Sequence, residues 1–417
     1  MELHSNIAEG RKEMYTPRAI ETVLKKAAGQ TKVILLTGAR QVGKTTTMNH
    51  VFPAYEYYTL DDDNELMMAL NDRELFFRDK SVPMIIDEVQ YAPELFRGIK
   101  KQADSRPDKG QFFLTGSQRY ELMGEASESL AGRISIIEMP GLSLREMIRD
   151  DMLLPFIPDG PFLEERKRNE RSVEKIWEII HRGSMPELQD ETRDREWFYR
   201  DYIRTYIERD VRKIVNIRDD LKFRSFLVSL AARSGQVLIY EDVARDVGID
   251  IKTVQRWVSV IAASGLVKII RPYSNNAIKR AIKAPKVFFM DTGLLCYLVG
   301  WNTVESAKNG AMSGNIFETF AVSEILKSHM NAGRSLENIY YYRDKDGKEI
   351  DLVILDGNTL YPVEIKKAAT IDTKWTKNFS VLDKITDREI GCGAVICRTE
   401  RIVPLDKKNN AIPVSMI

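Results

Sequence analysis

Apolar and polar positions along the chain form a pattern that predicts several folded regions in succession. In the first region, apolar runs of four or five residues alternate with stretches of helical periodicity, which is typical of buried strands joined by helices. These runs span residues 33–36, 83–86 and 111–115. Residues 1–145 are therefore predicted to form an α/β domain with helices on both faces of a sheet.

The next region combines helical spacing with short strands. Helices are predicted at 222–234, 241–247 and 251–264, a short strand at 237–239, and two strands at 266–270 and 286–290 that flank a polar, basic loop. Helices and strands in this order are typical of a winged helix. Residues 221–295 are accordingly predicted to form a winged-helix domain, with the basic loop as its wing.

Two further segments complete the predicted organisation. Residues 146–220 are predicted to contain a mobile linker or an insertion, rich in proline and charge over 155–171, and then a helical lid. Residues 296–417 are predicted to form a second α/β domain. Its predicted elements are a helix at 315–329 and strands at 338–342, 348–355 and 360–365.

A glycine-rich loop follows the first apolar run. Residues 38–45 read Gly-Ala-Arg-Gln-Val-Gly-Lys-Thr, which matches the phosphate-binding loop G-x-x-x-x-G-K-[ST] between a strand and a helix. The glycines let backbone N–H groups converge on phosphates, the lysine reaches the β and γ phosphates, and the threonine ligates Mg²⁺. The predicted ATP-binding residues are Gly38, Ala39, Arg40, Gln41, Val42, Gly43, Lys44, Thr45 and Thr46.

Polar residues after the next two runs extend this prediction. Asp87 and Glu88 follow the run 83–86. In a P-loop ATPase the first carboxylate holds Mg²⁺ and the second polarises the attacking water, which is otherwise a poor nucleophile. Thr115, the last residue of the third run, or Ser117 just after it is the expected contact to the γ-phosphate or the water. The predicted catalytic residues are Lys44, Asp87, Glu88, Ser117 and, for a reason given below, Arg133.

Composition adds a location and excludes some kinds of site. Of 417 residues 43% are apolar, which suffices for several hydrophobic cores, and the formal net charge is +1. No apolar segment is long enough to cross a bilayer and the first residues are polar, so a cytoplasmic protein without membrane contact is expected. Cys296, Cys392 and Cys397 lack the spacing of a zinc site and are expected to be free, buried thiols.

Basic residues are unevenly distributed. Residues 195–290 hold 19 Lys and Arg against 10 Asp and Glu, and residues 265–290 hold six basic residues and no acidic one. Such an excess attracts a polyanion, and DNA, duplex or branched, is the predicted partner. A solvated basic face and a protein-binding winged helix are the alternatives. The predicted DNA contacts are Lys252, Gln255 and Arg256 on the third helix, and Lys279, Arg280 and Lys283 in the wing.

The last domain contains a second candidate site. Glu318 lies on the predicted helix, Asp351 interrupts an apolar strand, and Glu364 and Lys366 stand at the end of the next strand. This order is the constellation of PD-(D/E)xK nucleases, in which the acids bind Mg²⁺ and the lysine steadies the hydroxide or the phosphate. Glu318, Asp351 and Glu364 are therefore candidate metal ligands, and a solvated strand edge is the alternative.

Together these motifs resemble the prokaryotic family of AAA+-type ATP-binding proteins in which a P-loop domain is fused to a C-terminal domain of unknown function with a restriction-endonuclease-like core. The resemblance covers nearly the whole chain. It is carried by residues 15–18, 36–45, 60–62, 86–90, 114–117, 130–133, 286–294 and 363–366. It implies an ATPase core with ATP and Mg²⁺ as cofactors but no established activity, because the family is mostly described only as ATP-binding.

An arginine follows the third run at the place where ring-forming AAA+ proteins carry an arginine finger, which reaches the γ-phosphate of the neighbouring subunit. Arg133, just before the predicted strand 134–138, is the candidate, and this role predicts a homo-oligomer, with a ring as one form. A phosphate contact within the same subunit and an ion pair at the Glu138 strand are the alternatives. Arg182 is a candidate second sensor of the nucleotide.

Three functions are compatible with these predictions. The favoured one is a DNA-binding AAA+-type ATPase that hydrolyses ATP with Mg²⁺ to remodel DNA or translocate on it. The second is an ATP-gated, metal-dependent nuclease, and the third is a signalling NTPase whose C-terminal modules bind protein. DNA-stimulated ATP hydrolysis separates the first two from the third, and metal-dependent cleavage of DNA separates the second from the first.

Overall fold

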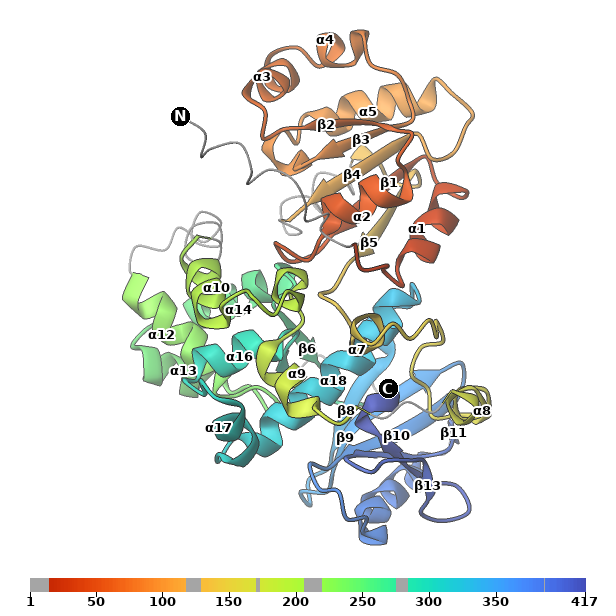
Figure 1. Ribbon diagram of the computed structural model, residues 1–417, viewed down its shortest axis with the longest axis vertical. Helices are drawn as coiled ribbons and strands as arrows, with labels where there is room; N and C mark the ends of the chain where they lie inside the picture. Colours follow the sequence, from red (N-terminus) through yellow and green to blue (C-terminus); the bar gives the residue numbers. More distant parts are fainter. Residues whose placement is uncertain (1–14, 118–128, 170–172, 206–219, 275–283, 386) are drawn as a thin grey trace, which may run out of the picture.

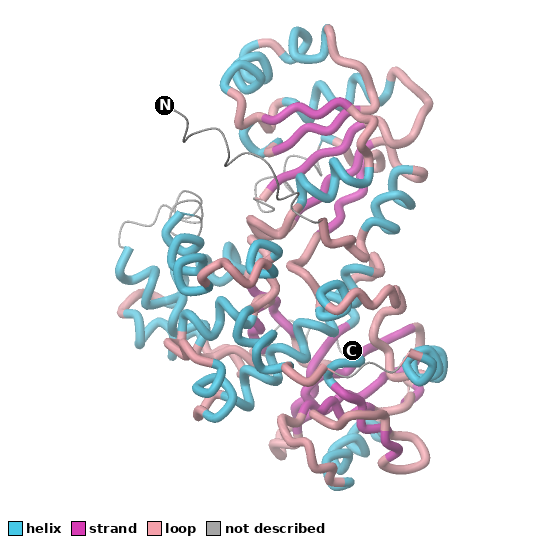
Figure 2. Tube along the Cα trace, in the orientation of Figure 1, coloured by secondary structure: helices cyan, strands magenta, loops and turns pink. Residues whose placement is uncertain are grey.

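The computed structural model describes residues 15–117, 129–169, 173–205, 220–274, 284–385 and 387–417. The chain forms an N-terminal α/β domain, a mainly helical middle region and a C-terminal domain built on another sheet (Figure 1). Figure 2 shows most of the strands gathered in two groups at the two ends of the molecule. The α/β fold predicted from the apolar runs is confirmed.

A five-stranded parallel sheet forms the N-terminal domain, in the order β2-β3-β4-β1-β5. Side chains of β1 alternate between two cores, with Ile34 and Leu36 in one and Val33 and Leu35 in the other. Helices α1 and α2 cover the first face, and α3, α4 and α5 the second. The strands are β1 (Val33–Thr37), β2 (Glu56–Thr59), β3 (Met84–Asp87), β4 (Phe112–Gly116) and β5 (Ile134–Glu138). The helices are α1 (Glu21–Ala28), α2 (Lys44–Val51), α3 (Asp63–Asn71), α4 (Arg73–Arg78) and α5 (Leu95–Asp104), with the 3-10 turn η1 (Val89–Tyr91) after β3.

The strand order decides which loops meet. Strand β4 lies between β1 and β3, and all three run in the same direction. The loop after β1, the carboxylates after β3 and the polar residues at the end of β4 therefore lie side by side at the carboxyl edge of the sheet.

The middle region consists of helices and one short hairpin, β6–β7. The predicted strand 237–239 is reduced to a single bridge between Val237 and Lys286 of this hairpin. The elements of the region are α7 (Leu144–Met147), α8 (Gly160–Arg168), α9 (Ile176–Arg182), η2 (Pro186–Gln189), α10 (Arg195–Tyr202), α12 (Asp220–Ala231), α13 (Tyr240–Val247), α14 (Ile251–Ala263), β6 (Val267–Ile270), β7 (Lys286–Phe289), α16 (Thr292–Leu298) and α17 (Val304–Asn309). The predicted boundary between residues 295 and 296 lies inside α16.

The segment predicted as a mobile linker is packed over its described residues. Phe156 and Phe162 are buried, and the buried guanidinium group of Arg166 in α8 forms an ion pair with Asp150. The backbone N–H of Phe156 donates to the Ser328 hydroxyl at 3.0 Å. This packing contradicts the mobile linker and leaves the alternative of an insertion. The sequence suggested mobility because charged residues outnumber the apolar ones that pack against the C-terminal domain.

The C-terminal domain is a seven-stranded mixed sheet in the order β13-β14-β12-β10-β9-β8, with β11 beside β10. Helix α18 (Ser313–Asn331) packs on one face and η5 (Thr373–Lys384) on the other. Almost every residue of α18 is buried, because the middle region covers its outer side. The other elements are η4 (Leu336–Asn338), β8 (Ile339–Arg343), β9 (Glu349–Asp356), β10 (Thr359–Ile365), β11 (Glu389–Ile390), β12 (Ala394–Cys397), β13 (Val403–Pro404), β14 (Asn410–Pro413) and η6 (Val414–Met416).

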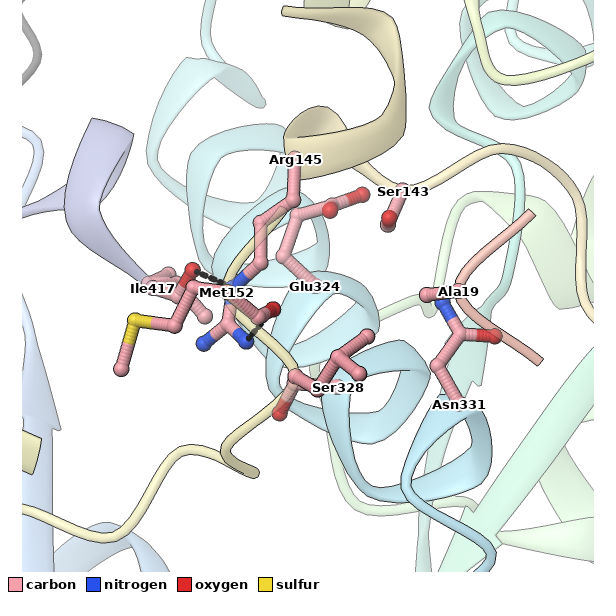
Figure 3. A pocket seen from close by; sticks show the side chains of 9 residues that line it. Ala19, Ser143, Arg145, Met152, Glu324, Ser328, Asn331 and Ile417 are labelled. Carbon is pink, nitrogen blue, oxygen red and sulfur yellow. Dashed lines mark hydrogen bonds between the residues drawn. The ribbon is translucent and has the colours of Figure 1, made fainter. Parts of the chain in front are cut away.

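A polar joint connects the segment that follows the N-terminal domain to α18. The Glu324 carboxylate accepts from the N–H of Leu144 at 2.6 Å, and the Lys327 ammonium group donates to the Leu142 carbonyl at 3.0 Å. Beside it, Arg145 points toward Ile417 and donates to its carbonyl oxygen at 2.7 Å (Figure 3). The cavity there is about 10 Å³, room for one water at most, so it is a packing joint and not a ligand site.

Two expectations from composition are tested by the structure. In the described part of the chain, no helix combines the length and the apolar character needed to cross a membrane. The three cysteines are free, and Cys296 and Cys397 are buried while Cys392 is partly exposed.

Candidate nucleotide-binding site and C-terminal carboxylate cluster

The phosphate-binding loop runs from the end of β1 into α2. Its backbone is left-handed at three positions, with φ of 146° at Gly38, 61° at Gln41 and 92° at Gly43. A Cβ atom at Gly38 would lie 2.3 Å from the Met139 carbonyl oxygen, so only glycine fits there. The result is a tight turn at a helix N-terminus, an arrangement whose backbone N–H groups bind phosphate.

Lys44 is held inside this turn. Its ammonium group donates to the carbonyl oxygens of Gly38 and Ala39, at 3.2 and 2.9 Å. Burial lowers the pKa of Lys44 to about 8, and the carboxylates of Glu88 and Asp87 oppose the shift. The predicted phosphate-binding cation is therefore in the loop and close to both predicted acids.

Asp87, the last residue of β3, is the centre of a hydrogen-bonded group. The Thr45 hydroxyl donates to both carboxylate oxygens at 3.0 Å, and the Tyr57 hydroxyl donates to Oδ2 at 2.7 Å. The Thr115 hydroxyl donates to Oδ1 of the same carboxylate. The structure thus brings Thr45 and Asp87 together, and a hydroxyl beside a carboxylate fits Mg²⁺, which prefers oxygen ligands.

Glu88 lies next to Asp87 with a left-handed backbone, φ 55°. Its N–H donates to Thr115 Oγ1 at 3.4 Å, and the Gln90 amide donates to its carboxylate. Burial raises the pKa of Glu88, which strengthens the carboxylate as a proton acceptor. The same Gln90 amide donates to the Ser117 hydroxyl at 3.3 Å, so Glu88 and Ser117 share one partner.

Arg133 lies at the opposite edge of the sheet from the phosphate-binding loop. Its carbonyl oxygen accepts from Val33, the first residue of β1, whereas the loop follows Thr37, the last. A strand of this length spans about 13 Å, so a phosphate contact within the same subunit does not fit the structure. The guanidinium group forms an ion pair with Asp104, at 2.6 and 3.0 Å, and not with Glu138; the side chain is 34% exposed.

Arg182 does not fit the role of a second sensor. Its guanidinium group donates to the carbonyl oxygens of Leu188, Asp190 and Arg193, at 2.5, 2.7 and 3.1 Å. These contacts use its donors to close the turn after α9. The hypothesis was wrong because the sequence does not show that this turn folds back over the arginine.

The phosphate-binding loop contacts the middle region directly. Lys268 on β6 forms an ion pair with Glu138, the last residue of β5, at 2.6 Å. Gly265 joins α14 to β6 and passes so close that a Cβ atom there would lie 3.3 Å from the Ala39 nitrogen. The end of the predicted recognition helix thus packs on the loop that is expected to bind ATP.

Helix α14 presents its predicted DNA-binding residues to solvent. Lys252, Gln255 and Arg256 are exposed on it, while Val254 and Trp257 face the core. The predicted wing residues Lys279, Arg280 and Lys283 lie outside the described residues. Two of the basic residues counted toward DNA binding have other partners, because Lys268 pairs with Glu138 and Lys286 lies in the C-terminal domain's acidic group.

The four predicted C-terminal residues come together where α18 lies against the ends of β9 and β10. Lys366 donates to Glu364 Oε1 at 2.5 Å, and the N–H of Ile365 donates to Asp351 Oδ2 at 2.7 Å. Glu364 is 7% exposed, and its Oε2 atom has no hydrogen-bond partner among the described residues. Glu318 faces Asp351 from α18. We call Glu318, Glu349, Asp351 and Glu364 the carboxylate cluster.

Lys286 of β7 reaches into the middle of this cluster. Its ammonium nitrogen lies 3.1 Å from Glu318, 2.6 Å from Glu349 and 4.0 Å from Asp351, and the side chain is 4% exposed. Burial alone would lower the pKa of Lys286, but Glu318, Asp351 and Glu349 outweigh it and raise the pKa. The lysine therefore stays charged.

The acids of the cluster titrate far from their usual range. Burial and the repulsion from Asp351 raise the pKa of Glu318 to about 8 and that of Glu364 to about 7. Burial also raises the pKa of Asp351, although Lys286 and Lys366 counteract the shift. Two lysines thus hold together acids that would otherwise repel one another.

This arrangement does not fit the predicted metal ion. Within the described ranges, no group of three or more His, Cys, Asp or Glu side chains is placed to hold a metal. The predicted ligand set of Glu318, Asp351 and Glu364 is not formed, because the Lys286 ammonium group lies within 4.0 Å of two of its members. Carboxylate oxygens that would have to approach Mg²⁺ to about 2.0–2.1 Å already pair with a cation.

Sequence analysis missed the side chains that support both sites. The contact of Tyr57 with Asp87 was not predicted, because Tyr57 lies in a short, half-exposed strand without a motif. Lys286 was counted only toward the basic excess, and its contact with Glu318 was not predicted. Arg18 donates to the Val42 carbonyl of the phosphate-binding loop at 2.8 Å and to the Glu146 carboxylate at 3.0 Å. Its one signal in the sequence was the segment 15–18, to which no role was assigned.

Comparison with known families divides the chain into three parts. Residues 30–148 match a family described as an AAA domain. Residues 173–305 match a domain of unknown function (DUF8612), and residues 313–417 match another domain of unknown function (DUF4143). The last two matches give no activity, so the nuclease-like core remains a hypothesis.

Similar proteins give the same picture. Two proteins described only as uncharacterized, from Mycobacterium bovis and Mycobacterium tuberculosis, are each 26% identical over 396 residues, which is 94% of this chain and 82% of theirs. A Walker-type ATPase of Pyrococcus abyssi is 14% identical with a TM-score of 0.38, covering 69% of this chain and 97% of its own. The AMPPCP-bound DnaA of Aquifex aeolicus is 14% identical with a TM-score of 0.27, and the match covers 58% of this chain and 85% of DnaA. Scores this low add nothing to the family match, by which residues 30–148 form a P-loop ATPase domain of the AAA type.

Proposed function

We propose that the chain is a DNA-binding ATPase that hydrolyses ATP with Mg²⁺ and uses the reaction to remodel DNA or translocate on it. The observation that carries this proposal is the group at the carboxyl edge of the N-terminal sheet. There the hydroxyl of Thr45 contacts Asp87 at 3.0 Å, with Lys44 and Glu88 close by. These residues have the chemistry that phosphate binding and water activation require.

In this site each side chain has a separate task. The N–H groups of residues 38–45 and the Lys44 ammonium group bind the phosphates of ATP. Mg²⁺, when bound by Thr45 and Asp87, neutralises charge on the phosphates. Glu88 orients the attacking water and accepts its proton, and Ser117, held by the Gln90 amide, contacts the water or the γ-phosphate.

DNA binding is proposed for the middle region. Its support is the exposed polar face of α14, which carries Lys252, Gln255 and Arg256, and the basic excess of the segment. Side chains of this kind contact phosphates and base edges. The contact between Gly265 and Ala39 supports coupling, because any change of the loop on ATP binding acts directly on the end of α14.

We also propose that the chain acts as a homo-oligomer. Arg133 cannot reach the phosphates of its own subunit, yet its side chain is partly exposed just before β5, at the amino ends of the strands. A neighbouring subunit that docks its nucleotide edge there would receive this arginine. The guanidinium group would leave Asp104, contact the γ-phosphate of the neighbour and stabilise the charge that develops there.

The rate of ATP hydrolysis tests the proposal when it is measured without DNA, with duplex, with single strand and with a four-way junction. We expect Mg²⁺-dependent turnover that DNA stimulates. The double variant Lys252→Ala and Arg256→Ala should lose the stimulation and keep the basal rate, since both side chains lie outside the nucleotide site. Turnover that no DNA changes would favour a signalling NTPase with protein partners.

A further inference from the structure

We propose that Lys286 is the permanent cation of the carboxylate cluster. In this arrangement the C-terminal domain takes up no divalent metal there and does not cut DNA. The cluster instead fastens the β6–β7 hairpin of the middle region to the C-terminal sheet. This inference goes beyond the proposed ATPase function and does not depend on the nucleotide site.

The contacts of Lys286 are those of a filled cation site. Three carboxylates from two elements, α18 and β9, lie within 4.0 Å of one ammonium group, and the side chain is 4% exposed. The ammonium group also lies 5.6 Å from the centre of the Tyr341 ring. Acids gathered in a buried place need a positive charge, and here the chain itself supplies it.

The backbone holds Lys286 in this position. Lys286 pairs with Ile270 inside the hairpin and forms a bridge with Val237 on its other side. The segment after β6 pairs with β8 through two backbone hydrogen bonds. The N–H of Tyr341 donates to the Arg271 carbonyl oxygen at 3.1 Å, and the N–H of Tyr273 donates to the Tyr341 carbonyl oxygen at 2.6 Å. The hairpin forms a two-stranded sheet of its own, and an isolated bridge between Pro272 and Tyr341 ties its end to the edge strand of the C-terminal sheet, which keeps Lys286 beside the cluster.

The Lys286 ammonium group and a divalent metal ion compete for the same carboxylate oxygens, and both cannot bind them at once. A divalent ion needs Asp351 and its neighbours as ligands, and a bound ammonium group within 4.0 Å would repel it. If the positive charge of Lys286 is removed, Glu318 loses the cation that lies 3.1 Å from it, while Lys366 remains on Glu364, whose buried Oε2 atom has no hydrogen-bond partner among the described residues. The chain without this charge should therefore recruit a metal that the natural chain excludes.

The test is Mn²⁺ binding by the full chain, followed by electron paramagnetic resonance and calorimetry. All variants carry Asp87→Asn, so that the nucleotide site contributes no metal. With Lys286 present, we expect no bound Mn²⁺ at a concentration of about 1 mM, which is on the order of the dissociation constant of the weakest cation sites in proteins. Lys286→Met should bind one Mn²⁺ per chain, and adding Asp351→Asn should abolish it. The matched control is Lys268→Met. This variant removes a lysine of the same hairpin that pairs with a single acid, Glu138 of β5, and it should bind no Mn²⁺.

Stability gives a second measurement. Lys286→Met removes the cation beside Glu318 and Asp351, so we expect the Tm to fall by about 10 °C and Mn²⁺ to restore part of the loss. If Lys286→Met does not fold, the double variant Lys286→Met and Glu318→Gln, which removes one charge of each sign, takes its place. If neither variant folds, the test is Mn²⁺ binding by the chain that keeps Lys286, measured with and without Asp351→Asn. The absence of Mn²⁺ binding that depends on Asp351 then supports the proposal.

Two results would overturn it. One is Mn²⁺ bound with Lys286 in place and lost with Asp351→Asn. The other is a folded Lys286→Met, or folded double variant, that binds no Mn²⁺. Both are independent of ATP hydrolysis, so failure here would leave the proposed function intact.

Discussion

At the scale of single residues, the proposed function predicts that a change at Glu88 separates nucleotide binding from hydrolysis. Glu88→Gln keeps the size of the side chain but removes the proton acceptor, so we expect kcat to fall by about 10²-fold or more. Binding of ATP should stay within a few-fold of the natural chain. Steady-state turnover and equilibrium binding of a labelled nucleotide measure the two effects. Lys44→Ala is the contrasting variant and should lose binding itself. Turnover of Glu88→Gln at the natural rate would exclude Glu88 as the base.

Arg133 is the residue that decides whether one subunit completes the site of another. Arg133→Ala and Lys44→Ala should each be inactive alone, because one lacks the arginine and the other the phosphate-binding lysine. Mixed together, they should regain part of the activity through interfaces that combine the intact halves. Asp104→Ala breaks the ion pair but keeps the arginine, and is expected to remain active. A fully active monomer at all protein concentrations would rule out the role in trans.

At the scale of elements, α18 contains a titratable group that couples its packing to pH. His329 Nε2 lies 2.9 Å from the Phe156 carbonyl oxygen. Burial, with Arg334 as a smaller contribution, lowers the pKa of His329 to about 4, against 6.5 for a solvated histidine. The folded state therefore binds this proton more weakly than the unfolded state. The contribution to stability is complete above pH 6.5 and is lost as the pH falls below it.

This difference predicts a loss of about 2 kcal/mol of unfolding free energy between pH 7.5 and pH 5 from His329 alone. His329→Gln cannot titrate, so its stability should fall by about 2 kcal/mol less over the same range. Urea unfolding followed by circular dichroism at each pH provides the measurement. Equal losses in both proteins would mean that the pKa of His329 is the same in the folded and the unfolded chain, and would contradict the prediction.

The predicted wing is the element whose charges should govern the salt dependence of DNA binding. Each phosphate contact changes log K by about 0.9 per unit of log salt on duplex DNA. Replacing Lys279, Arg280 and Lys283 by Ala should therefore reduce the slope by up to about 2.7. Fluorescence anisotropy at a series of salt concentrations measures it. The pair Lys407→Ala and Lys408→Ala serves as control, and an unchanged slope for the wing variant would place the wing away from DNA.

At the scale of the whole molecule, the ion pair between Lys268 and Glu138 connects the hairpin to the strand beside the phosphate-binding loop. Both side chains are at most 15% exposed. Lys268→Met should leave basal ATP hydrolysis within about twofold and reduce the stimulation by DNA by about fivefold, the lower range of typical coupling. DNA affinity measured in parallel shows whether coupling or binding is lost. Full stimulation in Lys268→Met would assign the coupling to other contacts.

The sequence by itself determined the nucleotide site. Residues 38–45 are consecutive, and Asp87 and Glu88 directly follow a buried strand, so local geometry and the common direction of parallel strands suffice to bring them together. The helix α14 and its exposed Lys252 and Arg256 were likewise predictable, because a period of 3.6 residues separates its buried face from its polar face. Such patterns depend only on neighbours along the chain.

Only the tertiary structure decided which charges meet. Lys286 and Glu318 are far apart in sequence, and nothing in the pattern of either segment shows that one neutralises the other where a metal was predicted. Arg133 was placed near a nucleotide by its order in the chain, but strand direction puts it at the far edge of the sheet. Charges act through space and are paired by the fold, whereas the linear sequence records only their number and order. For this reason the candidate nucleotide site could be predicted from the sequence, whereas the pairing of the C-terminal acids with Lys286 is seen only in the structure.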